Sequence, residues 1–318
     1  MKDFLAKLPF SLSVGCLILL GLSLILLPSQ NNLIAQASAR KNNLKQIDFE
    51  FNVSSYPLRL SDFDFNTITA TGAAVLDRDS GVFLLSKNAD LALLPASTIK
   101  IMTALVSLDQ YSLFEILRVP AVYDAGQDME LKEGELITVE ALLYGLLVSS
   151  ANDAAEVLAR NFPGGKEKFI DAMNRKAQSL GLKNSRFVNP TGLDNGEDIE
   201  LTGEKSYSSA KEMAWLADYA LKNQTFSRIV STKYIKLQDP QGRFFHQLYN
   251  LNELLWQIPE VKGVKTGWTE AAGECLVTLV EKNGHSLILV VMGSRNRFED
   301  TRTLINWVDN QVFWGNIN

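Results

Sequence analysis

Ser97 and Lys100 are residues whose types and spacing could support covalent catalysis. They lie three positions apart in the stretch PASTIKIMTAL, where the apolar pattern predicts the start of a helix, so their side chains would be neighbours. A serine hydroxyl becomes an effective nucleophile when a base removes its proton. A lysine can be that base if burial or a neighbouring cation lowers its pKa. Alone, the pattern is better explained by a capping serine beside an exposed lysine.

Two further motifs follow along the chain. Ser-Ala-Asn at residues 150–152 separates two helical stretches, a junction that could direct a hydroxyl and an amide into a cleft or simply cap a helix. Lys-Thr-Gly at residues 265–267 precedes a pair of strands. Its lysine brings positive charge and its glycine lets a substrate backbone come close, unless the lysine merely lies at a strand edge. Each motif alone favours the structural explanation, but the three in this order are not independent accidents.

Other hydrolytic sites have little support in the sequence. The chain has two histidines, His246 and His285, and lacks the G-x-S-x-G turn found in many Ser-His-Asp enzymes. It also lacks the H-E-x-x-H zinc motif. Cys16 and Cys275 have no disulfide or metal-ligand spacing, and Cys275 is expected to be a small buried residue. A nucleophilic serine would therefore be expected to use lysine as its base, with no metal or organic cofactor required.

The elements that must position these motifs predict one α+β domain. Two hairpins are expected near the chain ends, over residues 73–86 and 273–293, the second around an Asn-Gly turn. Leu304, Val308 and Val312 mark an amphipathic terminal helix. Strands at both ends predict an antiparallel sheet built from both ends of the chain, with a helical part attached. The helices between them are expected at residues 97–108, 138–148, 151–160, 166–180 and 208–221.

The composition is that of an ordinary globular protein with an apolar N-terminus. Of 318 residues, 46% are apolar and 21% charged, and the net charge of −5 gives no basic surface, so nucleic acid is not an expected partner. Residues 8–27 form a charge-free run of about 20 residues after Lys2 and Lys7, long enough to span a bilayer. Two A-x-A patterns at residues 35–39 would allow cleavage, although an uncleaved anchor is slightly favoured.

Longer blocks of sequence carry a family resemblance. Over about residues 72–310 the chain resembles the low-molecular-mass penicillin-binding proteins of the serine-type D-Ala-D-Ala carboxypeptidase family (peptidase family S11). The resemblance implies a β-lactamase/transpeptidase-like fold with a helical subdomain. Besides the three motifs it rests on the blocks LLPASTIKIMTALV, LLYGLLVSSANDAAEVLA, FIDAMNRKAQSLGLKNSRFVNPTGLD, YSSAKEMAWLA, GVKTGWTEAAGECLV and RFEDTRTLINW, in family order.

The resemblance implies catalytic roles for the motif residues. Ser97 would be the acyl-ester nucleophile and Lys100 its base. Ser150 would relay a proton to the leaving D-alanine, while Asn152 would hold the substrate backbone. Lys265 would keep a positive charge beside the site, which would also help to keep Lys100 neutral.

The resemblance also implies how substrate is bound. Thr266 would bind the terminal carboxylate, although strict strand alternation would aim its side chain away from Lys265 and Gly267. The backbone N–H groups of Ser97 and Trp268 would form the oxyanion hole. Trp268 replaces a residue that is often smaller or more polar in the family, so a narrower pocket entrance is expected. Arg297 matches a family arginine near the carboxylate-binding end, or is otherwise a solvated charge before a helix.

The function implied is a D,D-carboxypeptidase that removes the terminal D-alanine of peptidoglycan stem peptides, with β-lactams as covalent inhibitors. A D,D-endopeptidase that cuts cross-links would carry the same motifs. A non-catalytic β-lactam sensor is a further alternative, although no signalling domain is evident. A class A β-lactamase is disfavoured because the E-x-x-L-N pattern is absent between the second and third motifs.

The expected organisation follows from the resemblance and the apolar N-terminus. Residues 1–29 would be a signal peptide or membrane anchor, residues 30–67 a linker and lead-in, and residues 68–318 the catalytic domain. The family's frequent C-terminal β-domain is not expected after Trp314. The N-terminal helix is therefore expected to tether an extracytoplasmic catalytic domain to the cytoplasmic membrane.

Overall fold

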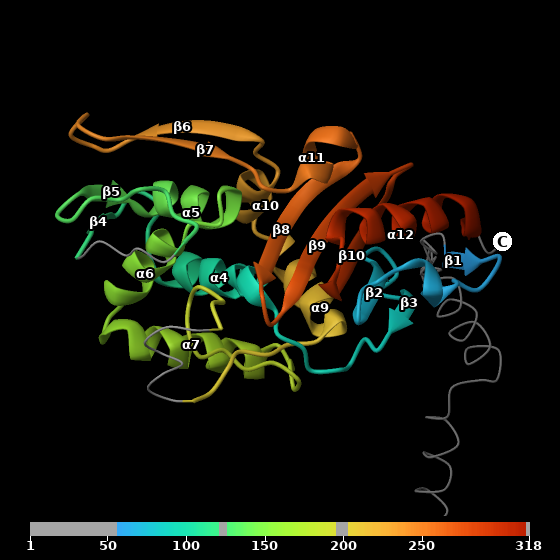
Figure 1. Ribbon diagram of the computed structural model, residues 1–318. Helices are drawn as coiled ribbons and strands as arrows, with labels where there is room; N and C mark the ends of the chain where they lie inside the picture. The colour runs from blue at the N-terminus through green and yellow to red at the C-terminus, as the bar shows by residue number, and fades with distance from the viewer. Residues whose placement is uncertain (1–55, 121–125, 195–202, 316–318) are drawn as a thin grey trace, which may run out of the picture. The chain divides into compact units, whose positions relative to one another are not determined.

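The computed structural model describes residues 56–120, 126–194 and 203–315 (Figure 1). They belong to a compact unit that begins at Val53, whereas residues 1–52 form a separate unit outside the described part. The apolar run of residues 8–27 and the A-x-A patterns lie outside it as well. Within the described ranges, no helix combines the length and apolar character needed to cross a membrane.

A five-stranded antiparallel sheet, ordered β3-β2-β10-β9-β8, joins the two ends of the chain. In β2, Val75 lies opposite Leu289 of β10, which brings residues more than two hundred positions apart into direct pairing. The predicted α+β class, with one sheet built from both chain ends, is confirmed. The strands are β2 (Gly72–Asp77), β3 (Phe83–Lys87), β8 (Val261–Thr269), β9 (Gly273–Lys282) and β10 (His285–Ser294).

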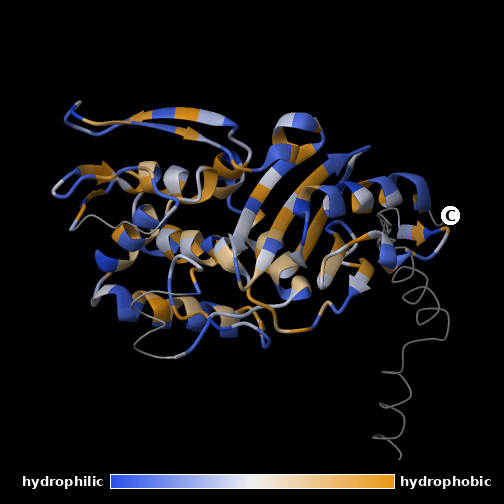
Figure 2. Ribbon diagram, viewed as in Figure 1, coloured by the Kyte–Doolittle hydropathy of each residue, from blue (hydrophilic) through white to orange (hydrophobic). Residues whose placement is uncertain are grey.

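Both faces of this sheet are covered, so its central strands are apolar along most of their length (Figure 2). Helix α12 (Arg297–Gln311) packs on one face and α9 (Ala210–Leu221) on the other (Figure 1). Because side chains alternate along a strand, neighbouring residues enter different cores. Leu289 packs with Leu304 on the α12 side, whereas Ile288 packs with the helical part of the chain.

The helical part lies between β3 and β8 in the sequence, as predicted. One predicted helix differs in its start: residues 96–99 form a 3-10 turn, η2 (Ala96–Ile99), and the α-helix begins only at Lys100. The remaining boundaries agree with the prediction within about two residues, as is usual for helix ends. The helices are α4 (Lys100–Gln110), α5 (Val139–Val148), α6 (Asn152–Arg160), α7 (Gly165–Ser179), α9, and α10 (Gln224–Val230).

Three short two-stranded sheets were not predicted. One pairs β1 (Tyr56–Arg59), within the expected lead-in, with β11 (Val312–Gly315). A second joins β4 (Ile116–Arg118) and β5 (Leu136–Thr138). The third is the hairpin β6 (Tyr234–Gln238) and β7 (Phe245–Tyr249), which is followed by α11 (Glu253–Gln257). Its buried face packs on the helical part near α5.

Candidate active site

Ser97 and Lys100 lie on consecutive turns where η2 runs into α4. The Lys100 ammonium nitrogen Nζ is 2.9 Å from Ser97 Oγ. Lys100 has no exposed surface, although lysine is rarely buried, whereas Ser97 is partly exposed. A serine open to solvent is therefore in direct contact with a lysine enclosed behind it.

The backbone that presents Ser97 is shaped by residues 189–192, which the sequence analysis did not single out. Asn189 Oδ1 accepts hydrogen bonds from the N–H groups of Thr191 (3.2 Å) and Gly192 (2.7 Å), which closes a tight turn. Gly192 has φ +84°, and a Cβ there would lie 2.1 Å from the carbonyl oxygen of Ala96, itself at φ +48°. Only glycine fits this approach. The Asn-Pro-Thr-Gly sequence was the signal that could have found this turn.

Lys100 Nζ has two further hydrogen-bond acceptors besides Ser97. Asn152 Oδ1 lies at 2.7 Å and the carbonyl oxygen of Thr191 at 2.6 Å. A neutral amine has two N–H donors and one lone pair. The two carbonyl-type oxygens can take both donors, which leaves the lone pair for the hydroxyl proton of Ser97. The geometry is that of a base facing its nucleophile.

Burial lowers the pKa of Lys100 to about 7 from its ordinary value of 10.5. The carboxylates of Asp153 and Glu156 act in the opposite direction and raise it. The sequence analysis assigned part of this effect to the charge of Lys265, but desolvation is the cause that dominates. Near neutral pH, Lys100 can therefore give up a proton and act as a base.

Ser150 and Asn152 occupy the junction between α5 and α6, and both are buried. Ser150 has φ +64°, an uncommon conformation for a residue with a side chain. Its Oγ accepts a hydrogen bond of 2.8 Å from Lys265 Nζ. The site thus contains two serine–lysine pairs, Ser97 with Lys100 and Ser150 with Lys265, and Asn152 contacts the first of them.

Lys265 is buried on the edge strand β8, and its environment works against the positive charge that the sequence analysis expected. Burial lowers the pKa of Lys265 well below its ordinary value, and the charges of Lys100 and Arg297 lower it further. Burial therefore disfavours the charged form of both lysines. A bound carboxylate would favour the protonated form of Lys265.

Thr266 and Gly267 follow the strand alternation. Thr266 pairs with Leu276, a residue of the core on the α12 side, whereas Lys265 pairs with Val277 of the opposite core. A Cβ on Gly267 would lie 3.0 Å from the backbone nitrogen of Ser97. The glycine was expected to admit a substrate backbone, but this space is filled by η2. Gly267 instead allows β8 to lie against the turn that carries Ser97.

Trp268 and Arg297 differ in how firmly they are held. The Trp268 side chain is 61% exposed on β8, beside the approach of this strand to Ser97. Arg297 begins α12, and its Nη1 donates a 2.9 Å hydrogen bond to the carbonyl oxygen of Gly267. Its backbone N–H binds Glu274 at 2.8 Å. Arg297 is therefore fixed against β8 rather than being a solvated charge.

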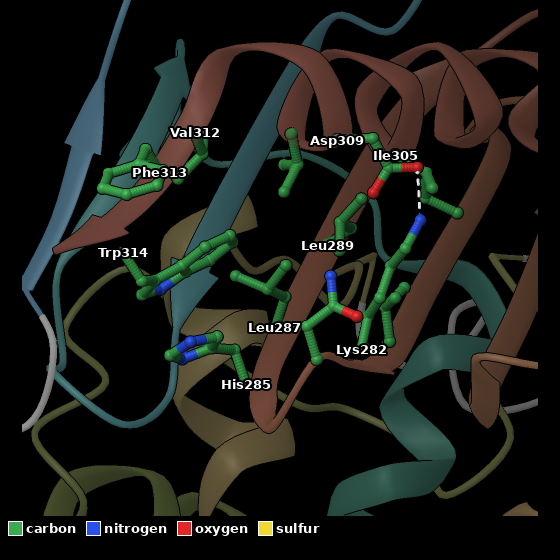
Figure 3. Close-up of a pocket in the computed structure, with 12 residues that line it drawn as sticks. Lys282, His285, Leu287, Leu289, Ile305, Asp309, Val312, Phe313 and Trp314 are labelled. Atoms are coloured by element: carbon green, nitrogen blue, oxygen red, sulfur yellow. Dashed lines mark ion pairs between the residues drawn. The ribbon is translucent and has the colours of Figure 1, made fainter.

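The two histidines have other partners. His246 hydrogen-bonds Met129 and Glu135. His285 stacks on Trp314, with ring centroids 4.4 Å apart, and both line a pocket of about 290 Å³ between β10, α12 and β11 (Figure 3). Cys275 is buried, as expected. In the described ranges, no cluster of three or more His, Cys, Asp or Glu side chains could hold a metal ion.

The contact between a partly exposed serine and a buried lysine is the arrangement found in a class of serine hydrolases that use lysine in place of histidine. The chain belongs to the D-alanyl-D-alanine carboxypeptidase family, peptidase family S11, whose family model matches residues 60–296. The family predicted from the sequence is confirmed, and with it the class of serine peptidases. The members of this family are named for their action on D-alanyl-D-alanine.

Individual relatives agree with this assignment. The D-alanyl-D-alanine carboxypeptidase DacF of Bacillus subtilis is 35% identical over 76% of this chain, which spans 61% of DacF. A D-alanyl-D-alanine endopeptidase of Pseudomonas aeruginosa is 33% identical over 81% of this chain and 83% of its own length. The crystal structure of the Streptomyces K15 DD-transpeptidase superposes with a TM-score of 0.69 at 31% identity, covering 76% of this chain and 97% of that one.

Proposed function

We propose that this chain is a D,D-carboxypeptidase that removes the terminal D-alanine from peptidoglycan stem peptides through an acyl-enzyme on Ser97. The observation that carries the proposal is the 2.9 Å contact between Ser97 Oγ and a buried Lys100 whose pKa is about 7. A nucleophile paired with a base of matched pKa is what acyl transfer at neutral pH requires.

The reaction follows from these positions. Lys100 takes the proton of Ser97, and Oγ attacks the carbonyl carbon between the two D-alanines. The N–H groups of Ser97 and Trp268 stabilise the oxyanion. The proton taken up by Lys100 passes through Ser150 to the leaving amine, which restores the neutral base, and the C–N bond breaks so that D-alanine departs and leaves the Ser97 ester. Water then hydrolyses this ester and restores the hydroxyl. In a β-lactam the same attack opens the ring, whose amine stays attached to the acyl group.

The substrate's carboxylate is bound at the other end of the site. The Arg297 guanidinium donates to the carbonyl oxygen of Gly267, and the Lys265 amine donates to the carbonyl oxygen of Thr266, so both groups lie against β8. An incoming carboxylate would raise the pKa of Lys265 and draw a proton into the site. Binding of a free C-terminus would therefore be coupled to protonation of Lys265, and it would weaken as pH rises above the pKa of that lysine.

The catalytic domain is proposed to lie outside the cytoplasmic membrane, held there by the apolar run of residues 8–27. This part of the proposal is supported by sequence: the run carries no charge over about 20 residues and follows two lysines. Peptidoglycan, the substrate class of the family, is itself an extracytoplasmic polymer. The tether would keep the enzyme near its polymer without requiring affinity for the membrane from the catalytic domain.

The test is direct. The full chain is incubated with a labelled penicillin and, separately, with a pentapeptide ending in D-Ala-D-Ala and with a cross-linked dimer. We expect label on Ser97 and release of D-alanine from the pentapeptide, both abolished in Ser97→Ala. Faster cleavage of the dimer would favour the endopeptidase alternative. Labelling without turnover would favour a sensor, and an adduct on Ser150 would overturn the assignment of the nucleophile.

A further inference from the structure

His246 and Glu135 form a buried pair that the proposed mechanism does not use. His246 lies on the inner face of β7, and Glu135 just before β5; neither side chain has appreciable exposure. Ring atom Nε2 is 2.7 Å from Glu135 Oε1, and Nδ1 is 2.8 Å from the carbonyl oxygen of Met129. Burying an acid and an imidazole is unfavourable unless both are fully hydrogen-bonded, so the arrangement needs an explanation.

The hydrogen bonds of this pair are complete. A backbone carbonyl can only accept, so Nδ1 carries a proton towards Met129, and one further proton lies between Nε2 and the carboxylate. The second carboxylate oxygen of Glu135 accepts from the backbone N–H of Lys132 at 3.0 Å. The pair therefore fastens two points of the segment 127–135 to the hairpin β6–β7.

The same segment is fastened on its other side to the start of α6. The carboxylate of Asp153 accepts from the backbone N–H of Met129 (3.1 Å) and of Leu131 (3.0 Å). The backbone N–H of Asn152 donates to the carbonyl oxygen of Gln127 at 2.8 Å. Met129 is thus held by His246 at its carbonyl and by Asp153 at its N–H. Asn152, which directly precedes Asp153, contacts Lys100.

We infer that His246 is a positioning residue for the reaction: through Met129 and Asp153 it fixes the first turn of α6, and so the distance from Asn152 to Lys100. The effect of His246 on catalysis rests on the proposed function, whereas the chain of hydrogen bonds from His246 to α6 does not. The inference explains why a polar ring stands on a strand face whose next inward residue, Leu248, is apolar. An apolar ring could fill the space but could not bind the Met129 carbonyl.

The test removes the Met129 hydrogen bond without leaving a buried charge. In Glu135→Gln the amide can donate to Nε2 of a neutral ring and still accept from Lys132, so this variant serves as the background. His246→Leu in that background breaks the bond to Met129. His246→Asn restores a donor at the position of Nδ1. Leu248→Ala is the matched control, because it loses buried packing on the same strand and leaves the hydrogen bond between His246 and Met129 in place.

Two measurements decide the outcome. Amide exchange of Met129, Leu131 and Asn152 should quicken in the double variant that combines Glu135→Gln with His246→Leu, and not in Leu248→Ala. The rate of acylation at saturating penicillin should fall between about tenfold and a hundredfold, with the dissociation constant of the initial complex little changed, and recover with His246→Asn. Unchanged exchange would overturn the link, and unchanged acylation would overturn its catalytic role. If the native chain takes no label, the proposed function fails while the exchange data still decide the link.

Discussion

At the residue scale, the chemistry depends on keeping a lysine neutral. Lys100 is enclosed by α4, the start of α6 and the turn at Thr191, and its Nζ lies within hydrogen-bonding distance of three oxygen atoms. Two carboxylates lie near enough to raise its pKa, yet desolvation outweighs them. Removing either the enclosure or the two accepting oxygens would return Lys100 to an ordinary surface cation.

Lys100→Arg tests the base. Arginine keeps its charge at any pH near neutrality because its pKa lies above 12, so it cannot take the Ser97 proton. We expect acylation by penicillin to slow by about two to four orders of magnitude, the range that general base catalysis supplies. The measurement is the rate of label incorporation in folded protein, with Ser97→Ala as the negative control. A rate near that of the native chain would mean that another base acts on Ser97.

The pH dependence of acylation follows from the same group. The pKa of Lys100 is lowered to about 7, and the neutral amine is the active form. Below that pH Lys100 is protonated and cannot accept a proton, so the rate should rise as pH increases through about 7 and level off above it. The measurement is the second-order rate constant for acylation by a penicillin between about pH 5.5 and 8.5, a window that brackets this pKa on both sides. An ascending limb centred well away from neutrality would contradict the assignment.

The sequence predicted the residues of the site better than it predicted the contacts that hold those residues in place. Ser97, Lys100, Ser150, Asn152 and Lys265 were named from motifs, and the structure brings them together. Their supporting contacts involve residues far apart in the sequence, such as Thr191 with Lys100 and His246 with Met129. Periodicity and local motifs carry no information about such pairs, so neither contact could be predicted.

At the element scale, the 3-10 turn η2 presents the nucleophile, and it is held by the turn at Gly192. Gly192→Ala would place a methyl group 2.1 Å from the carbonyl oxygen of Ala96, in a backbone conformation that already disfavours a side chain. We expect η2 to shift, with acylation reduced by about a hundredfold, as for other displacements of about 1 Å. The thermal unfolding midpoint should fall as well.

Gly181→Ala is the matched control for this prediction. Gly181 has a similar positive φ, +75°, but a Cβ there meets nothing within 4 Å. Both variants carry the conformational penalty of about 1–2 kcal/mol for a left-handed alanine, and only Gly192→Ala adds the clash. Equal acylation by the two variants would show that the turn at Gly192 does not hold Ser97 in place.

Helices and strands were predicted correctly where the apolar periodicity is strong, and were missed or misplaced where a turn sets the boundary of the element. The hairpin around Asn283-Gly284 and the long helices were predicted, since their apolar patterns extend over many residues. The start of α4 was placed too early because η2 and the helix share one apolar pattern. The hairpin β6–β7 was missed, although Asp239-Pro240 and Gly242 between its strands are a turn signal. Short strands with aromatic outer faces lack clear alternation of apolar and polar residues.

At the scale of the whole molecule, the site lies where the sheet meets the helical part. Lys265 and Gly267 come from the edge strand, whereas Lys100 and Asn152 come from helices that pack beside it. The edge position of β8 leaves one side of the strand unpaired within the sheet, next to the Ser97 turn. The order of strands in the sheet could be predicted only in outline, because β2 pairs with β10, a strand more than two hundred residues away in the sequence.

The N-terminal run carries the prediction about the full chain. Residues 8–27 are free of charge, and a charged side chain at the centre of a spanning helix costs about 2.5–3.5 kcal/mol on insertion scales. We therefore expect the full chain in the membrane fraction. Leu17→Arg should shift it towards the soluble or unexported fraction, whereas Leu17→Ile should not.

The A-x-A patterns at residues 35–39 supply the competing outcome, because a peptidase that cut there would release the domain. The mature N-terminus decides between the two. A membrane-bound chain that begins at Met1 or Lys2 supports the tether, and a released chain that begins at Ser38 or Arg40 contradicts it. In either case, externally added protease should reach the catalytic domain in spheroplasts, because export does not depend on whether the helix is retained. A catalytic domain protected until the spheroplasts are lysed would contradict the extracytoplasmic location itself.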